Sequence, residues 1–235
     1  MSDIPRQLAQ TLGRIRCSCE RAGRDPLSVR LVAVSKTFPK ADILEAISVG
    51  QQCFGESKLQ EAEQKIAELP AGLEWHFIGR VQRNKVRKIL PLFRCIHAVD
   101  SIKLAVYMDG IAGELGLRPE VFIQVDQAGE ASKGGFSAIE LKKSMPTLTG
   151  LSHLKIVGLM SIPPAAENPE DSRHWFRELR EMRDDLGNDF SVDLPSLSMG
   201  MSGDFEVAVE EGATHVRVGS LIFGNRSYKV EGEIG

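Results

Sequence analysis

The period of apolar and polar residues changes repeatedly along this chain, which predicts alternating strands and helices. Short apolar runs with two hydrophobic faces are typical of strands buried in a parallel sheet. Apolar residues that recur every three or four positions between charges are typical of amphipathic helices. The predicted strands are 31–36, 52–55, 75–79, 95–100, 120–126, 155–161, 196–199 and 215–219. The predicted helices are 4–22, 39–49, 57–69, 84–90, 101–115, 137–148, 175–186 and 205–211, with a short turn at 221–223.

The order of these elements indicates the fold class α/β. Eight strands that alternate with helices in about 200 residues are the signature of a single (β/α)8 TIM barrel near its lower size limit. The helix 4–22 precedes the first strand and is an extra N-terminal helix. A doubly wound open sheet is the alternative, but the eightfold count and the missing Gly-x-Gly-x-x-Gly fingerprint argue against it.

The chain shows no linker rich in Pro, Gly or Ser, so residues 1–235 are expected to form one domain. Two capping boxes, Ser57–Gln60 and Ser137–Glu140, predict where two helices begin. The chain ends about a dozen residues after the last predicted strand, so we expect no C-terminal β domain.

Composition narrows the class of protein. The 235 residues are 42% hydrophobic with a net charge of −3, which argues against a nucleic-acid binder. No apolar run approaches the ~20 residues that span a bilayer, and the N-terminus lacks the features of a signal peptide. We therefore expect a cytoplasmic protein without membrane contact, and the polar surface favours a monomer. The four scattered cysteines lack metal-site spacing and are expected to be reduced.

The first candidate for chemistry is Lys36, which follows the apolar run 31–35. In parallel α/β folds the carboxyl ends of strands carry the active site. A partly desolvated lysine there can lose its proton and attack a carbonyl as a free amine. The alternative is a lysine that extends from the strand end into water.

Two glycine-bearing loops follow the seventh and eighth predicted strands. The loop 198–204 leads into a helix, with Ser202 as the expected N-cap, and Gly219-Ser220 follows the last strand. Such loops offer backbone N–H groups to an anion, and many barrels hold a phosphate between these two positions. Ordinary turn chemistry is the alternative for either loop alone.

Arg217 and His76 lie on predicted strands, where each has two interpretations. Arg217 is flanked by valines, and a buried arginine needs acceptors, from a ligand beside the phosphate loops or from Asp100 or Asp126. His76 or its neighbours face the lumen, and a lone strand histidine is more often structural than catalytic.

An amine on the first strand facing a phosphate cup at the last two strands suits a ligand with a carbonyl at one end and a phosphate at the other. Pyridoxal 5'-phosphate (PLP) fits this description, and so does a phosphorylated sugar in a Schiff-base aldolase. The pattern of residues does not separate these two ligands.

With these residues identified, the chain resembles the pyridoxal phosphate homeostasis protein family, also called the YggS/PROSC family. The resemblance covers residues 28–228. It rests on the blocks 31–37, 54–56, 74–79 with Gln82 and 84–85, 158–160, 197–202 with Asp204 and Glu206, and 216–219 with 222–224.

The resemblance implies a barrel similar to the N-terminal domain of alanine racemase, with PLP held as a Schiff base. It implies that Lys36 forms the Schiff base, that Ser202, Gly219 and Ser220 hold the phosphate, and that Arg217 approaches the pyridine nitrogen. The residues implied around the ring are His76, Met160, Ser198, Met199 and Gly200. The family usually has Asn-Tyr where this chain has Ser57-Lys58, and threonine at the position of Ser220. At Ser57 this chain therefore lacks the side-chain amide that the family usually has near the cofactor, whereas Ser220 keeps the hydroxyl.

The function implied is PLP binding for intracellular homeostasis and carriage, with apo PLP-dependent enzymes as possible recipients and without robust catalysis. A positive arginine at the pyridine nitrogen makes the ring a weaker electron sink, which suits storage. A racemase-like enzyme with weak activity is the alternative, and it needs a second acid/base group near the ring.

Overall fold

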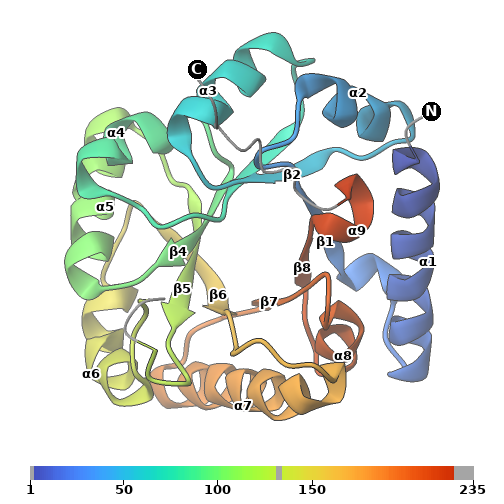
Figure 1. Ribbon diagram of the computed structural model, residues 1–235. Helices are drawn as coiled ribbons and strands as arrows, with labels where there is room; N and C mark the ends of the chain where they lie inside the picture. The colour runs from blue at the N-terminus through green and yellow to red at the C-terminus, as the bar shows by residue number, and fades with distance from the viewer. Residues whose placement is uncertain (1–2, 131–133, 225–235) are drawn as a thin grey trace, which may run out of the picture.

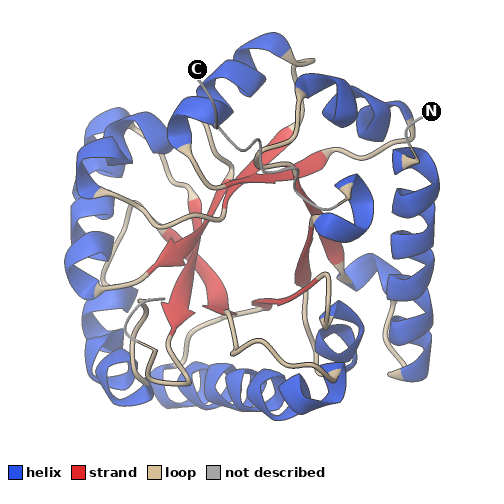
Figure 2. Cartoon of the chain, viewed as in Figure 1, coloured by secondary structure: helices blue, strands red, loops and turns tan. Residues whose placement is uncertain are grey.

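A computed structural model shows that the predicted α/β architecture is a closed barrel, and it describes residues 3–130 and 134–224. The strand order is β1 to β8 in sequence, every neighbouring pair is parallel, and β8 closes against β1 (Figure 1). The helices form a ring around the strands (Figure 2). The prediction of a (β/α)8 TIM barrel is confirmed, and the open-sheet alternative is wrong.

The strands agree with the predicted ones to within a few residues at each end. They are β1 (Arg30–Val34), β2 (Cys53–Glu56), β3 (Glu74–Phe77), β4 (Cys95–Val99), β5 (Glu120–Val125), β6 (Lys155–Ser161), β7 (Ser196–Met201) and β8 (His215–Val218). Strand β1 therefore ends before Lys36, and β7 is longer than the pattern predicted.

Nine α-helices and three short 3-10 helices are present in the described residues. The α-helices are α1 (Ile4–Arg21), α2 (Lys40–Ser48), α3 (Leu59–Glu68), α4 (Val86–Ile89), α5 (Ile102–Leu115), α6 (Ala138–Thr149), α7 (Arg173–Phe190), α8 (Phe205–Glu210) and α9 (Ser220–Phe223). The 3-10 helices are η1 (Pro26–Ser28), η2 (Arg83–Lys85) and η3 (Pro169–Ser172). Helix α1 packs outside the barrel beside α8 and α9, as an extra N-terminal helix (Figure 1).

One of the two predicted capping boxes is present and the other is absent. The Ser137 hydroxyl accepts a hydrogen bond from the Glu140 N–H, and the Glu140 carboxylate accepts one from the Ser137 N–H. Helix α3, in contrast, begins after Lys58 without a side-chain cap, so the predicted cap at Ser57 is wrong. The physical reason is that β2 runs through Glu56, which places the Ser57 backbone against Gly79 and one residue outside the cap position.

Alternation along the strands separates two cores. In β1 the side chains of Leu31 and Ala33 belong to the large core between strands and helices, whereas Val34 faces the cavity at the strand ends. Since successive strand residues point to opposite faces, the intervening residues fill the lumen. A small apolar cluster in the lumen contains Cys95, Ala98, Phe122, Val157 and Met160. No helix in the described residues is long and apolar enough to cross a membrane.

Candidate functional site

The carboxyl ends of β1, β6, β7 and β8 surround a cavity of about 300 Å³. This volume is at the lower end of the range of small-molecule pockets. The described lining residues are Val34, Lys36, Phe38, Ile78, Ile162, Met201, Ser202, Gly203, Arg217, Gly219, Ser220 and Gly224. Five of the predicted site residues are therefore together in one cavity: Lys36, Ser202, Arg217, Gly219 and Ser220. A hollow of about 540 Å³ between η2 and α5 is lined by residues of these two helices and by none of the predicted site residues.

The backbone that carries Lys36 has an unusual conformation. Thr37, the next residue, has a φ of 72°, which is rare for a β-branched residue. Its N–H donates a hydrogen bond of 2.5 Å to Glu61 Oε1 on α3. Such conformations cost on the order of 1–3 kcal/mol and persist only where the surroundings fix them. The turn after β1 therefore fixes where Lys36 enters the cavity.

A buried ion-pair network binds the backbone on the N-terminal side of Lys36. Lys65 Nζ donates to the Ser35 carbonyl at 2.8 Å, to Glu56 Oε1 at 2.7 Å and to Glu61 Oε1 at 2.7 Å. Glu56 is fully buried, which raises the pKa of its carboxyl, and the hydrogen bonds from Lys65 and Ser35 oppose that rise. The residues before and after Lys36 are thus bound to the same network.

Glu61 and Lys65 are not among the site residues predicted from the sequence. Their spacing of four residues on a predicted helix could have indicated an ion pair. Nothing in the spacing indicates that this pair would also reach the backbone on both sides of Lys36, because that contact depends on how α3 packs on β1 and β2.

Arg217 is the buried floor of the cavity. Its guanidinium donates to Ser198 Oγ at 2.5 Å and to the Ser161 carbonyl at 3.0 Å. Burial lowers the pKa of Arg217 to about 10, an effect that the charge of Asp204 opposes. A guanidinium has five donors, so acceptors on a bound ligand can add to these two contacts.

The ion pair considered for Arg217 has neither of the two expected partners. Among the described residues, Asp100 lies 3.6 Å from Arg80, and Asp126 accepts a hydrogen bond from the Glu130 N–H. The contacts of Arg217 are instead to a hydroxyl and a carbonyl. The guanidinium therefore stays available to a neutral or anionic acceptor in the cavity.

The two predicted phosphate loops are in direct contact. The Gly219 N–H donates to Ser202 Oγ at 3.2 Å, which joins the loop after β7 to the loop after β8. The prediction that Ser202 is the N-cap of α8 is wrong. Strand β7 extends to Met201, and Asp204 occupies the N-cap position. The Asp204 carboxylate accepts instead from the Met201 N–H. The helices that follow have six and four residues, so backbone N–H groups matter more here than helix dipoles.

Gly200 allows α8 to approach β7 closely. It has a φ of 88°, and a Cβ there would lie 2.6 Å from the Ala208 Cβ and 2.9 Å from the Phe205 Cα. Any larger residue would push α8 away from the loop that carries Ser202. The role of Gly200 in this structure is therefore to set the shape of the loop.

The other predicted residues surround the cavity without lining it. His76, Ser198 and Met160 are buried and lie deeper in the lumen. Met199 packs in the core between strands and helices, and Ser57 is half-buried next to Gly79. Contacts of these five residues with a cofactor remain predictions.

Comparison with known proteins gives a consistent family. The model of the alanine racemase N-terminal domain matches residues 13–227. A relative from Aquifex aeolicus named pyridoxal phosphate homeostasis protein is 45% identical over 94% of this chain and 98% of its own length. A relative of the same name from Escherichia coli is 37% identical over 97% of this chain and 99% of its own length. The resemblance to the pyridoxal phosphate homeostasis protein family that the sequence motifs indicated is thereby confirmed.

Solved structures agree with this result. PipY of Synechococcus elongatus, solved with PLP bound, is 40% identical and superposes with a TM-score of 0.83 over 94% of this chain and all of PipY. An alanine racemase from Clostridium difficile has a TM-score of 0.71 at 14% identity, which shows a common fold. The superposed part is 95% of this chain and 58% of that racemase.

Proposed function

Because this chain belongs to the pyridoxal phosphate homeostasis protein family, we propose that it binds PLP at the strand ends of the barrel for intracellular PLP homeostasis and carriage. The observation that supports the proposal most strongly is that Lys36, Arg217 and the Ser202–Gly219 contact share one cavity of about 300 Å³. The cavity combines the amine of Lys36, the cation of Arg217, and the backbone N–H and hydroxyl groups of the two loops after β7 and β8. These are the groups that suit an aldehyde, a ring nitrogen and a phosphate.

Each residue in the cavity has a proposed role. Lys36 presents its amine to the ligand, and PLP, when bound, supplies an aldehyde that this amine can convert to a Schiff base with loss of water. Ser202, Gly219 and Ser220 hold the phosphate, and Arg217 donates to the pyridine nitrogen. The residues proposed to support the ring from outside the cavity lining are Ser57, His76, Met160, Ser198, Met199 and Gly200.

Binding without robust catalysis is the proposal for activity. Among the described residues that line the cavity, Lys36 and Arg217 are the only two with ionisable side chains. Moving a proton between the two faces of an amino-acid α carbon needs an acid/base group on each face, and arginine rarely gives up its proton. A cationic Arg217 at the ring nitrogen also keeps the ring a weak electron sink.

Weak racemase-like activity is the alternative, and the shared fold with alanine racemase is what favours it. It predicts exchange of the α hydrogen of an amino acid for deuterium faster than free PLP allows. Exchange equal to that of free PLP would exclude it.

We propose further that the protein acts in the cytoplasm as a monomer and delivers PLP to apo PLP-dependent enzymes. The four cysteines are free, three of them buried, as suits a reducing compartment. We propose that neither a membrane nor a nucleic acid takes part.

The test is the visible spectrum of the purified protein with added PLP, before and after borohydride reduction. The expected result is a Schiff-base band that reduction fixes to the protein and that is lost in Lys36→Ala. Lys40→Ala is the matched control, because Lys40 lies four residues away, is half exposed and pairs with Glu68 outside the cavity. A wild-type protein that takes up no PLP would contradict the proposal and favour a phosphorylated sugar as ligand.

A further inference from the structure

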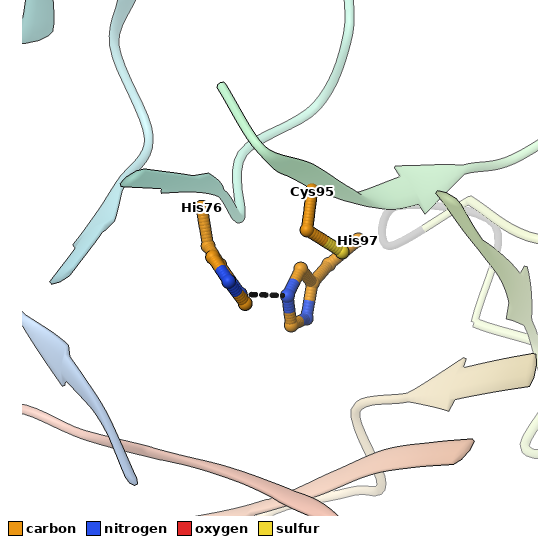
Figure 3. Close-up of side chains that lie close together, drawn as sticks. All are labelled: His76, Cys95 and His97. Carbon is orange, nitrogen blue, oxygen red and sulfur yellow. Dashed lines mark hydrogen bonds between the residues drawn. The ribbon is translucent and has the colours of Figure 1, made fainter. Parts of the chain in front are cut away.

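A continuous chain of polar side chains crosses the barrel lumen beneath the cavity. From Arg217 the contacts run to Ser198 Oγ at 2.5 Å, from there to His97 Nδ1 at 2.7 Å, and from His97 Nε2 to His76 Nδ1 at 2.8 Å. The last contact joins His76 Nε2 to Glu74 Oε1 at 2.8 Å. Figure 3 shows the two imidazole rings, from β3 and β4, facing one another. Barrel lumens are usually filled by branched aliphatic residues, so this chain of hydrogen-bonded polar side chains needs an explanation.

The partners determine where the protons lie in this chain. The hydrogen bond from His76 lowers the pKa of Glu74 to about 2, so its carboxylate is ionised and His76 Nε2 must carry a proton. In a neutral His76 ring, Nδ1 then accepts, and the proton of that contact must belong to His97 Nε2. His97 is fully buried, which lowers the pKa of its imidazole well below the usual value. Its Nδ1 therefore accepts as well.

The same logic fixes the last link. With His97 Nδ1 as acceptor, the Ser198 hydroxyl must donate to it. The Ser198 oxygen is then free to accept from the Arg217 guanidinium. Every donor in the chain points the same way, from a cation in the cavity to a carboxylate at the opposite end of the lumen.

We propose that Ser198, His97, His76 and Glu74 are positioning residues that fix the Arg217 guanidinium beneath the ligand and make Ser198 a stronger acceptor for it. Hydrogen bonds in a chain polarise one another, and a carboxylate at the end strengthens each link in a low-dielectric interior. This stabilises the charge of Arg217, which burial disfavours. What Arg217 meets in the cavity rests on the proposed function, whereas the direction of the chain does not.

A metal ion is the other chemistry that these side chains could support. Donor atoms of His76, Cys95 and His97 all lie within 4.8 Å of one another. However, the two imidazole nitrogens that face each other are hydrogen-bonded together, and burial raises the pKa of the Cys95 thiol well above its usual value. The contacts therefore favour a hydrogen-bonded chain over a metal site.

The test is 15N NMR of the histidine rings in the protein without PLP at neutral pH. We expect the proton of each ring, His76 and His97, to lie on Nε2, and we expect both signals to be unchanged when excess Zn2+ is added. A proton on His97 Nδ1 would overturn the proposed direction. If Zn2+ shifted the 15N signals of both rings, these side chains would form a metal site, and the proposed hydrogen-bonded chain would be wrong.

Two matched substitutions test whether the carboxylate acts at a distance. In Glu74→Gln the amide can donate or accept, so a proton on His76 Nε2 is no longer required. We expect His97, which is hydrogen-bonded to His76 on the side away from Glu74, to populate the Nδ1–H form as well. Glu120→Gln removes a carboxylate from the start of β5 that pairs with Arg94 and Lys155, and it should leave both rings unchanged. No change at His97 in Glu74→Gln would overturn the coupling.

The cofactor provides the second readout. With PLP labelled at the ring nitrogen, we expect Glu74→Gln to shift the 15N signal while borohydride still fixes the cofactor to Lys36. An unshifted signal would show that the chain does not reach the ligand. If the wild-type protein takes up no PLP, the proposed function fails, while the tautomers measured without PLP still test the direction of the chain.

Discussion

The Lys65 ammonium lies 2.7 Å from the Glu56 carboxylate in the interior of the protein, and the same ammonium binds the Ser35 carbonyl next to Lys36. Glu56 is completely buried and Lys65 nearly so. This pair therefore links the position of the proposed ligand-binding amine to the packing of α3. Two charges in such surroundings stabilise the fold only together, because either one alone would be an uncompensated buried charge.

We predict that Lys65→Met lowers the free energy of unfolding by about 3–5 kcal/mol, the cost of breaking a buried pair. The substitution leaves the Glu56 carboxylate without its charged partner, and the Ser35 carbonyl keeps only the hydrogen bond from the Phe38 N–H. Urea denaturation followed by circular dichroism measures the effect. Adding Glu56→Leu should restore part of the loss, since the orphaned charge is removed as well.

Lys40→Met is the control for this experiment. Lys40 pairs with Glu68 at 2.6 Å, but both side chains are about half exposed. Exposed pairs contribute about 0–1 kcal/mol, so this variant should unfold nearly as the wild type does. Equal losses in the two variants would contradict the importance of burial.

Gly158→Ala should be strongly destabilising. A Cβ at this position of β6 would lie 1.7 Å from the Ser196 carbonyl oxygen, where β6 pairs with β7. Overpacking costs about 1–3 kcal/mol even against side chains, and this contact is with backbone. Gly110→Ala on α5 meets nothing within 4 Å and should stabilise the protein by about 0.5–1 kcal/mol. Thermal unfolding of both variants compares them directly.

Ser198→Ala should weaken the interior at the floor of the cavity. The Arg217 guanidinium loses an acceptor and His97 Nδ1 loses its hydrogen-bond partner, and unsatisfied buried groups cost about 1–3 kcal/mol each. We expect the variant also to bind PLP more weakly, as measured by absorbance titration. Ser48, at the end of α2, is exposed and its hydroxyl donates to the Glu45 carbonyl, so Ser48→Ala should change stability by less than about 0.5 kcal/mol.

Acid should destabilise the protein between pH 6.5 and pH 3. Burial lowers the pKa of His215 to about 3, so in this range the unfolded chain binds a proton there that the folded chain does not. Stability therefore falls as the pH falls, by about 1.4 kcal/mol per pH unit for each such group. His97, whose pKa is also lowered by burial, acts in the same direction.

The slope of unfolding free energy against pH, from urea denaturation at several pH values, tests this. His215→Gln should reduce the slope between pH 6.5 and pH 3 by about one proton. His174→Gln, at a position near the start of α7 and outside the lumen, should leave it unchanged. An unchanged slope in His215→Gln would show that the histidine is not held neutral.

The sequence determined the class of fold because the period of apolar residues reports directly which faces are buried. Eight buried strands alternating with helices leave few arrangements, and the closed barrel is one of them. The positions at the strand ends then follow, so Lys36, Ser202, Arg217, Gly219 and Ser220 could be placed in one cavity from the sequence.

Cap positions were less well determined because they depend on where a strand stops. Ser57 and Ser202 have the residue types of N-caps, yet β2 and β7 extend far enough to move the caps to Lys58 and Asp204. A shift of one or two residues changes hydrogen-bond partners without changing the hydrophobic pattern. Local propensity therefore could not decide between the neighbouring positions.

Only the tertiary structure decided which polar residues meet inside the barrel. Glu74, His76, His97, Ser198 and Arg217 come from four strands, and only Glu74 and His76, two residues apart on β3, are related by their spacing in the sequence. The register between strands and the direction of each side chain bring them into one line of hydrogen bonds. These are long-range properties of barrel closure, which a periodic pattern along one strand does not contain.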